Sequence, residues 1–176
     1  VSFNASGLSG ESVTSPTSLQ FGPDYRLYVA QQDGTIYAYT IVRNGPSNFQ
    51  VTDTETIDLV KQIPNYNDDG TPAPSVTNRQ VTGLLVEGTQ QNPVLYVSSS
   101  DFRIGAGGGP DTGLDTNSGI ISRLTWTGSA WDKVDIVRGL PRSEENHATN
   151  GLQLDKPTNT LYVASGGNTN AGAPSN

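Results

Sequence analysis

The tripeptide Leu-Tyr-Val occurs three times in the chain at nearly equal intervals. Its copies occupy residues 27–29, 95–97 and 161–163, which places them 68 and 66 residues apart. Two similar intervals indicate a structural repeat. The repeat restricts the fold to architectures built from units of about 67 residues.

Each copy follows a short apolar segment and a polar turn, a pattern that predicts an antiparallel hairpin. The apolar segments are residues 19–21, 84–86 and 152–154. Two more strand-like segments follow each of the first two hairpins: residues 35–41 and 51–59 in the first unit, and residues 119–126 and 131–137 in the second. The sequence therefore predicts units of four antiparallel strands.

The composition supports an all-β fold. Hydrophobic residues make up 33 % of the chain, and 20 Gly and 11 Pro indicate a backbone that turns often. No stretch keeps apolar residues at helical spacing, which disfavours a helical bundle or coiled coil.

Repeated four-stranded units are typical of a β-propeller, in which the inner strand of each blade lines a central channel. A β-sandwich is the alternative, but it predicts no motif at fixed spacing. The expected blades span approximately residues 12–60, 80–138 and 147–176, the last incomplete. Dividing 176 residues by about 67 gives about 2.6 blades, and a closed propeller has about four to eight. We therefore expect a fragment of a longer propeller, whose remaining blades come from elsewhere.

Charge and composition exclude several classes of function. The chain has 10 basic and 17 acidic residues, a net charge of −7, which is the wrong sign for a general nucleic-acid binder. No apolar run reaches the roughly 18 residues of a membrane span. The absence of Cys excludes disulfides and zinc–thiolate sites.

Aligning the three units on their inner-strand leucines predicts a site at the mouth of the channel. The alignment of Leu19, Leu85 and Leu152 places Thr14, Gln80 and His147 at one position, five residues upstream. Side chains of successive blades converge at such a mouth. His147 is the only histidine, and an imidazole can take up a proton near neutral pH. The alternative is a structural histidine.

Three stretches resemble a known family. They are Arg-Gln-Val-Thr-Gly-Leu-Leu at residues 79–85, Arg-Gly-Leu-Pro at 138–141, and the segment 147–152, which is followed by residues 161–163 and by Gly-Gly-Asn-Thr-Asn at 166–170. Over about residues 79–171 the chain is similar to the soluble quinoprotein glucose/sorbosone dehydrogenases. These are secreted six-bladed propellers that bind pyrroloquinoline quinone (PQQ) and calcium.

The resemblance implies oxidation of a sugar hydroxyl, with His147 as the base and hydride transfer to the quinone. It also implies that Gln80 contacts the quinone and that Asn146, Asn168 and Asn170 lie near the cofactor. Well-known members have Asp in place of Asn146, and the family's calcium ligands and basic quinone contacts lie in later blades. An extracellular or periplasmic location follows from the same resemblance.

The long connection at residues 101–119 suggests a second site. Asp111, Asp115 and Asn117 offer the oxygen ligands that calcium prefers. Their spacing differs from that of an EF-hand. The alternative is that they stabilise turns through local hydrogen bonds.

Two functions follow from these observations. The first is part of a PQQ- and calcium-dependent sugar dehydrogenase. The alternative is a non-catalytic extracellular propeller module that binds carbohydrate, calcium or a partner protein, because propellers serve many functions. The open strand edges of an isolated fragment predict association.

Overall fold

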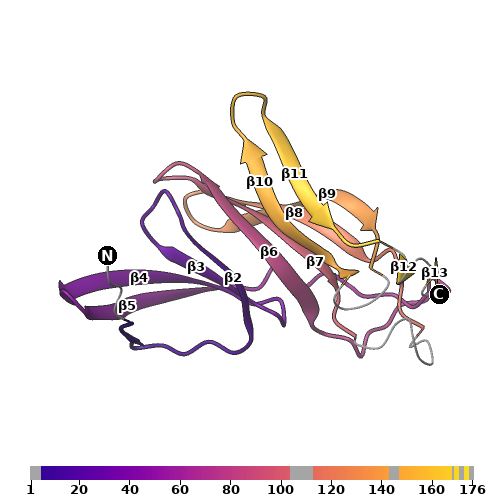
Figure 1. The fold of residues 1–176 in the computed structure, drawn as a ribbon, viewed down its shortest axis with the longest axis horizontal. Helices are drawn as coiled ribbons and strands as arrows, with labels where there is room; N and C mark the ends of the chain where they lie inside the picture. Colours follow the sequence, from indigo (N-terminus) through magenta and orange to yellow (C-terminus); the bar gives the residue numbers. More distant parts are fainter. Residues whose placement is uncertain (1–4, 104–112, 143–146, 168, 171–172, 175–176) are drawn as a thin grey trace.

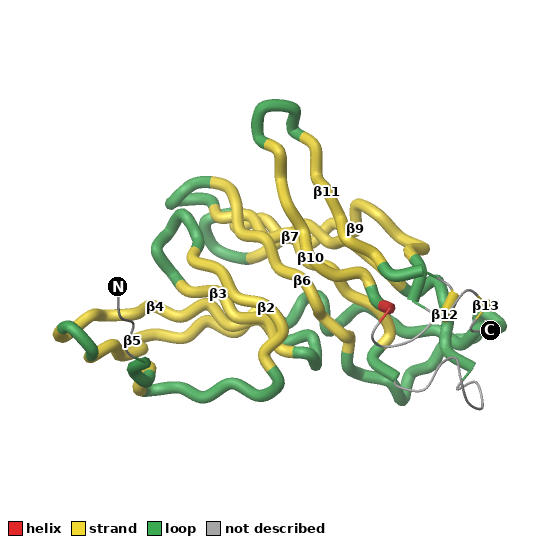
Figure 2. Tube along the Cα trace, viewed as in Figure 1, coloured by secondary structure: helices red, strands yellow, loops and turns green. Residues whose placement is uncertain are grey.

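The computed structural model describes residues 5–103, 113–142, 147–167, 169–170 and 173–174. Strands and loops make up almost all of this part of the chain, so the predicted all-β class is confirmed (Figure 2). The strands are β1 (Leu8–Ser9), β2 (Pro16–Phe21), β3 (Leu27–Gln31), β4 (Ile36–Gly45), β5 (Asn48–Ile57), β6 (Arg79–Gly88), β7 (Pro93–Asp101), β8 (Gly119–Trp126), β9 (Trp131–Leu140), β10 (Thr149–Asp155), β11 (Thr160–Ser165), β12 (Thr169–Asn170) and β13 (Ala173–Pro174).

The strands form two larger sheets and two hairpins (Figure 1). In the first sheet β2 to β5 are consecutive and antiparallel, and the short β1 adds a parallel pair with β5. In the second sheet β6 to β9 are likewise consecutive and antiparallel. β10 pairs with β11, and β12 with β13. The strands predicted for the first two units are thus present as two antiparallel sheets, and β10–β11 is a separate hairpin.

Local sequence explains the tight turns that make this order possible. Between β3 and β4, the Asp33 carboxylate accepts hydrogen bonds from the backbone N–H and the hydroxyl of Thr35. Gly34 follows with a φ of 99°, a left-handed conformation that favours glycine, and donates its N–H to Gln31. The Asp-Gly pair therefore sets the hairpin.

The first hairpin of each unit has the same register and the same irregularity. Leu19 pairs with Val29, Leu84 with Val97 and Leu152 with Val163. A bulge interrupts each inner strand a few residues earlier, between Pro16 and Ser18, Val81 and Gly83, and Thr149 and Leu152. A bulge repeated at one position shows that the three hairpins are copies of one local structure.

This register corrects the alignment drawn from the sequence. Leu84, not Leu85, is equivalent to Leu19 and Leu152. Both residues of the Leu84-Leu85 pair fit an apolar strand, and the sequence does not tell which of them faces the valine. Arg79 rather than Gln80 consequently occupies the position of Thr14 and His147.

Each first hairpin has two faces, which we name by their place in the stack. The leading face carries Leu19 and Phe21 in the first unit, Leu84 and Val86 in the second, and Leu152 and Leu154 in the third. The trailing face carries the residues between and opposite them, which are Gln20 and Tyr28, Leu85 and Tyr96, and Gln153 and Tyr162.

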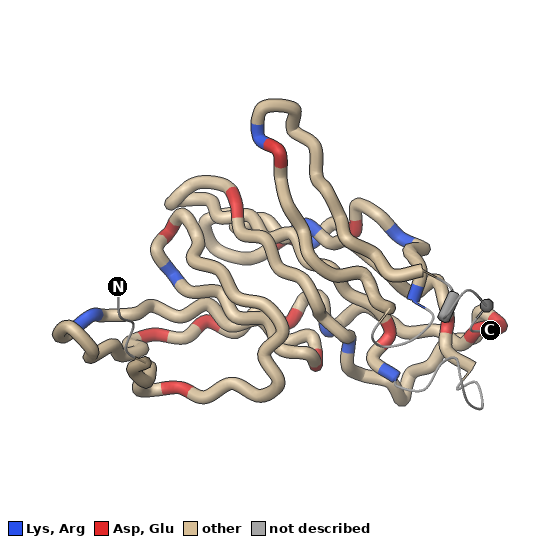
Figure 3. The backbone as a smooth tube through the Cα atoms, in the orientation of Figure 1, with Lys and Arg blue, Asp and Glu red and all other residues tan. Residues whose placement is uncertain are grey.

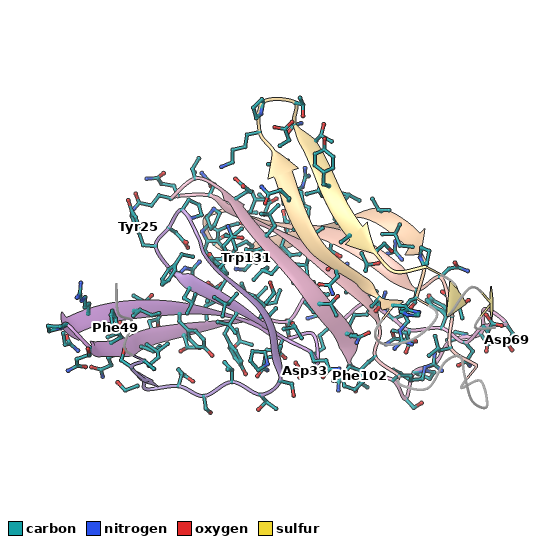
Figure 4. The ribbon with its side chains drawn as sticks, in the orientation of Figure 1. Tyr25, Asp33, Phe49, Asp69, Phe102 and Trp131 are labelled. Atoms are coloured by element: carbon teal, nitrogen blue, oxygen red, sulfur yellow. The ribbon has the colours of Figure 1, made fainter. Side chains whose placement is uncertain are left out.

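The units stack with a trailing face against the next leading face. The main core joins the first two sheets in this way, with Tyr28 and Ala38 of the first against Leu84 and Leu95 of the second. Trp131 of β9 lies in the same interface, where its ring meets Tyr28 edge-on at 6.4 Å (Figure 4). Burial of these apolar side chains is the main stabilising contribution.

The third unit follows the same direction. β10 contacts β6 and β7, and the β10–β11 hairpin projects beyond the second sheet (Figure 1). The Ser98 hydroxyl donates to the Asn150 carbonyl at 2.7 Å, and Lys156 pairs with Glu87 at 2.8 Å. Ser98 lies on the trailing side of the second unit, so the stacking order is preserved.

Charged residues of both signs are interspersed along the described chain (Figure 3). Within that part of the chain, no helix has the length and apolar character needed to cross a membrane.

Candidate functional site

The site predicted from the sequence lies where the inner strands β6 and β10 begin. The Thr82 hydroxyl donates to the Thr149 carbonyl, which ties the two strands together. Gln80 and His147 each lie two residues before these contacts, and both strands run from the same end of the molecule (Figure 1). The structure therefore brings the starts of the two strands to one edge.

His147 stands at this edge with its side chain partly exposed. The next residue, Ala148, accepts a hydrogen bond from the Gly166 N–H at 3.4 Å. A Cβ on Gly166 would come within 2.1 Å of the His147 carbonyl oxygen, so glycine is needed there. One glycine of the Gly-Gly-Asn-Thr-Asn segment thus has a packing role beside His147.

Gln80 is held inside the protein. The residue is 4 % exposed, and its side-chain Oε1 accepts a hydrogen bond from the Ser100 hydroxyl at 3.2 Å. In this position Gln80 orders the end of β7 and offers little surface to a ligand.

Arg79, beside it, is the functional candidate that the sequence analysis missed. The residue is 2 % exposed, and its guanidinium donates to Asn65 Oδ1 at 2.9 Å, to the Ser118 carbonyl and to Ser99 Oγ at 3.4 Å. Burial lowers the pKa of Arg79 to about 10, although Asp101 and Asp115 act in the opposite direction. Within the described chain its hydrogen-bond partners are neutral, an unusual surrounding for a buried charge.

A second arginine holds the long connection of the second unit at its start. The Asp101 carboxylate, fully buried, accepts from Arg103 Nε at 3.0 Å and Nη2 at 2.8 Å. Arg103 also donates to Asn67 Oδ1 and to the Tyr66 carbonyl. Arg142 donates to the Arg103 carbonyl and closes the set.

The sequence carried one signal of this buried polar network. Four polar residues, Ser-Ser-Ser-Asp at residues 98–101, follow the second Leu-Tyr-Val directly and are all fully buried. Polar residues at the end of a central strand need internal partners. The run therefore indicates a hydrogen-bonded cluster at the end of β7.

The predicted calcium ligands are only partly described. Asp115 Oδ1 accepts from the Asn117 backbone N–H at 2.8 Å, a local turn contact, and Asp111 lies outside the described residues. No group of three His, Cys, Asp or Glu side chains suited to a metal occurs in the described chain. The observed contact is the one expected if Asp115 stabilises a turn.

The resemblance places three asparagines near the cofactor. Asn146 and Asn168 lie outside the described residues, and for Asn170 only the backbone, in β12, is described.

Two hollows flank the starts of the inner strands. One, of about 270 Å³, is lined by residues that include Arg79, Arg138 and Asp115. The other, of about 530 Å³, lies at the start of β2 and is lined by Ser12, Thr14, Ser15, Gln31, Gln32, Asp33, Tyr37 and Phe102. Asp33 and Phe102 lie close to each other at this end of the molecule (Figure 4). Polar residues therefore make up most of the lining of this hollow, together with Tyr37 and Phe102.

Comparison with known proteins adds no relative: no family model matches the chain, and no curated protein matches it. The resemblance to quinoprotein dehydrogenases stays a prediction from the motifs.

Proposed function

We propose that the chain forms three successive units of a β-propeller and that the edge shared by β6 and β10 is its functional end. A five-stranded sheet, a four-stranded sheet and a third hairpin stack in one direction, and their first hairpins share one register, which supports this arrangement. Further units, from the same chain or from a partner, would complete the ring.

At that edge we propose oxidation of a sugar hydroxyl, as in the quinone-dependent dehydrogenases, in an extracellular or periplasmic protein. The observation that carries the proposal is that β6 and β10 start at one edge, where His147 is partly exposed. His147 would take the proton of the sugar hydroxyl as general base. In the family, the bound quinone supplies the acceptor for the hydride.

The described residues fit this cofactor incompletely. Gln80, the expected quinone contact, is buried and bonded to Ser100, so we assign it to positioning. No acidic cluster in the described chain fits calcium. We derive no step through either group, and the contribution of this chain is limited to the base and the surface around it.

A non-catalytic carbohydrate-binding module is the second candidate. The hollow of about 530 Å³ favours it, because its polar and aromatic lining suits a sugar without any redox group. The two candidates differ in whether His147 is needed.

An oxidation assay with an artificial electron acceptor tests the first candidate. In the complete propeller, with PQQ and calcium added, we expect aldose oxidation by the wild-type protein and a kcat lower by several hundred-fold in His147→Ala. Thr158→Ala, at an exposed turn of the third hairpin, is the matched control and should keep the wild-type rate. Equal rates in His147→Ala and the control would remove the histidine assignment, and sugar binding without oxidation would favour the second candidate.

A further inference from the structure

A hollow of about 440 Å³ lies between the first two sheets at their turn end, the end that holds the β2–β3 and β6–β7 turns. Its lining comes from these two turns, from β4 and β5 of the first sheet and from the end of β8 in the second. Two adjacent units thus form both of its walls. The volume lies within the range of about 300 to 1,000 Å³ that is typical of sites for small molecules.

Tyr25, which lines this turn-end hollow, has an unusual backbone conformation. Its φ is 67°, in the left-handed region that is costly for a bulky side chain. Its N–H donates to the Gly22 carbonyl at 3.1 Å. The corresponding turn of the third unit has the same bond, from Asn159 to Lys156 at 3.3 Å, and a φ of 53° at Asn159. Asparagine tolerates that conformation, so the turn itself does not need a tyrosine.

Packing does not account for the tyrosine either. Tyr25 lies at the tip of the β2–β3 turn and is 76 % exposed, so its ring buries little apolar surface (Figure 4). Backbone strain at an exposed side chain points to a role for that side chain. From the second sheet, Trp126 also lines the hollow, and its ring packs against that of Trp131 at 5.6 Å. Each wall of the turn-end hollow therefore carries an aromatic side chain.

The ion pair between Arg26 and Glu55 lines the same hollow and keeps hydrogen-bonding capacity. An arginine side chain has five N–H donors, and in the described chain Arg26 uses three of them, for two carboxylates and the Tyr28 hydroxyl. Two of the five remain. One oxygen of Glu55 accepts from Arg26 and the other from Trp131, and each can accept a second bond. The two side chains are 21 % and 28 % exposed, so the hollow offers a donor beside an acceptor.

We propose that the turn-end hollow binds a neutral sugar ring, such as a glucose unit of a β-linked oligosaccharide. A glucopyranose unit has C–H groups on both faces, which contact the rings of Tyr25 and Trp126. Around its edge are neighbouring hydroxyls, of which one donates to Glu55 and the next accepts from Arg26. A neutral ligand suits this lining because the charges of Arg26 and Glu55 are already paired. The hollow lies at the opposite end of the strands from His147, so this binding is independent of the proposed oxidation.

Tryptophan fluorescence gives a readout that is specific to this site. Trp126 and Trp131 are the only tryptophans in the chain, and both lie at the turn end. Titration with cellotetraose, a β-linked glucose oligomer, should change their emission and reach saturation. Sorbitol, which has neighbouring hydroxyls but no ring, should leave the emission unchanged at the same concentrations.

Three variants at tyrosine positions sharpen the test. Tyr25→Asn should weaken binding about tenfold, because one aromatic contact is lost. The same variant should unfold at a higher urea concentration, because asparagine adopts the left-handed backbone at lower cost. Tyr25→Phe keeps the ring and should bind as the wild type does. Tyr162→Asn, at an exposed tyrosine outside the hollow, is the matched control and should leave the titration unchanged.

Three results would overturn the proposal: no change in emission with cellotetraose, an equal response to sorbitol, or wild-type affinity in Tyr25→Asn. Lower stability of Tyr25→Asn would also overturn it, because Tyr25 would then have a structural role. Binding detected by calorimetry without a change in fluorescence would place the sugar elsewhere and reject this site. The proposed oxidation is tested separately, because His147→Ala should keep the fluorescence titration, and a protein that binds cellotetraose but oxidises no sugar rejects only the enzyme.

Discussion

The two ends of the interface between the first and second sheets each hold an arginine, but in opposite surroundings: Arg26 is partly exposed and Arg79 is buried. At the turn end, Arg26 pairs with Asp24 at 2.6 Å and with Glu55, and it donates to the Tyr28 hydroxyl at 2.9 Å. At the strand-start end, Arg79 donates to Asn65, Ser99 and Ser118.

The pKa values show the consequence. Burial alone lowers the pKa of Arg26, but its bonds to Asp24 and Glu55 outweigh burial and raise it. For Arg79 burial prevails, and the pKa falls to about 10. The turn end is an ordinary network of partly exposed ion pairs, whereas the strand-start end holds a buried charge whose hydrogen-bond partners in the described chain are neutral. The hydrogen bonds of Arg79, at the proposed functional edge, should therefore contribute more to stability than the ion pairs of Arg26.

Replacing the two arginines is the strongest test of this comparison. Arg79→Ala leaves buried acceptors on Asn65 and Ser118 without their donor and opens a cavity, so we expect a loss of about 3 kcal/mol in the free energy of unfolding. Arg26→Ala removes partly exposed ion pairs and should cost about 1 kcal/mol. Urea unfolding measures both, and equal losses would contradict the distinction.

Acid should destabilise the protein by protonating Asp135, a carboxylate whose charge acts on Arg79 at the strand-start end. Burial by itself raises the pKa of Asp135, but hydrogen bonds from Ser122 and Lys133, with the charge of Arg138, lower it below the ordinary 3.8. The stabilisation by Asp135 is therefore complete above about pH 4 and is lost as the pH falls through the lower, folded-state value.

Asp135→Asn should remove this part of the pH dependence and reduce the free energy of unfolding at pH 7 by about 1 kcal/mol. Unfolding by urea between pH 2 and pH 7 measures the effect. A variant with the wild-type slope in acid would show that Asp135 contributes nothing to it.

The smallest expected effect concerns the hydrogen bond across the turn end. Trp131 Nε1 donates to Glu55 Oε1 at 2.8 Å, between β9 and β5. In a double-mutant cycle with Trp131→Phe and Glu55→Ala, we expect a coupling of about 0.5 kcal/mol. Lys156→Ala, which breaks an exposed pair with Glu87, serves as a control and should change stability by less than about 0.5 kcal/mol. A coupling of zero would show that this hydrogen bond contributes nothing to the stability of the turn end.

The strands and their order could be predicted from the sequence because each sheet is built from neighbouring segments. The Leu-Tyr-Val strands, the segments after them and the turns all occur where the alternation of apolar and polar residues indicates. The register could not be predicted, because Leu84 and Leu85 fit the pattern equally well and the bulge shifts one residue against its partner strand.

The polar run at residues 98–101 indicates a buried cluster, but its other members could not be predicted from the sequence. Arg79, Asn65 and Ser118 are far apart in the chain, and each is a residue type that is usually exposed. Only the packing of the 58–78 connection beside β6 and β8 shows that they share a set of hydrogen bonds. A motif local in the sequence can predict single site residues. It cannot predict hydrogen bonds between residues far apart in the chain, such as those of Arg79 with Asn65 and Ser118.

The consecutive order of strands within each sheet has a consequence for synthesis of the protein. A chain emerging from the ribosome has all of β2 to β5 available before β6 is made, and every pairing within that sheet joins strands next to each other in sequence. Such local contacts form early and at low entropic cost. Each finished sheet then offers a template on which the following hairpin can condense, so the protein can fold from its N-terminus onward at the pace of translation.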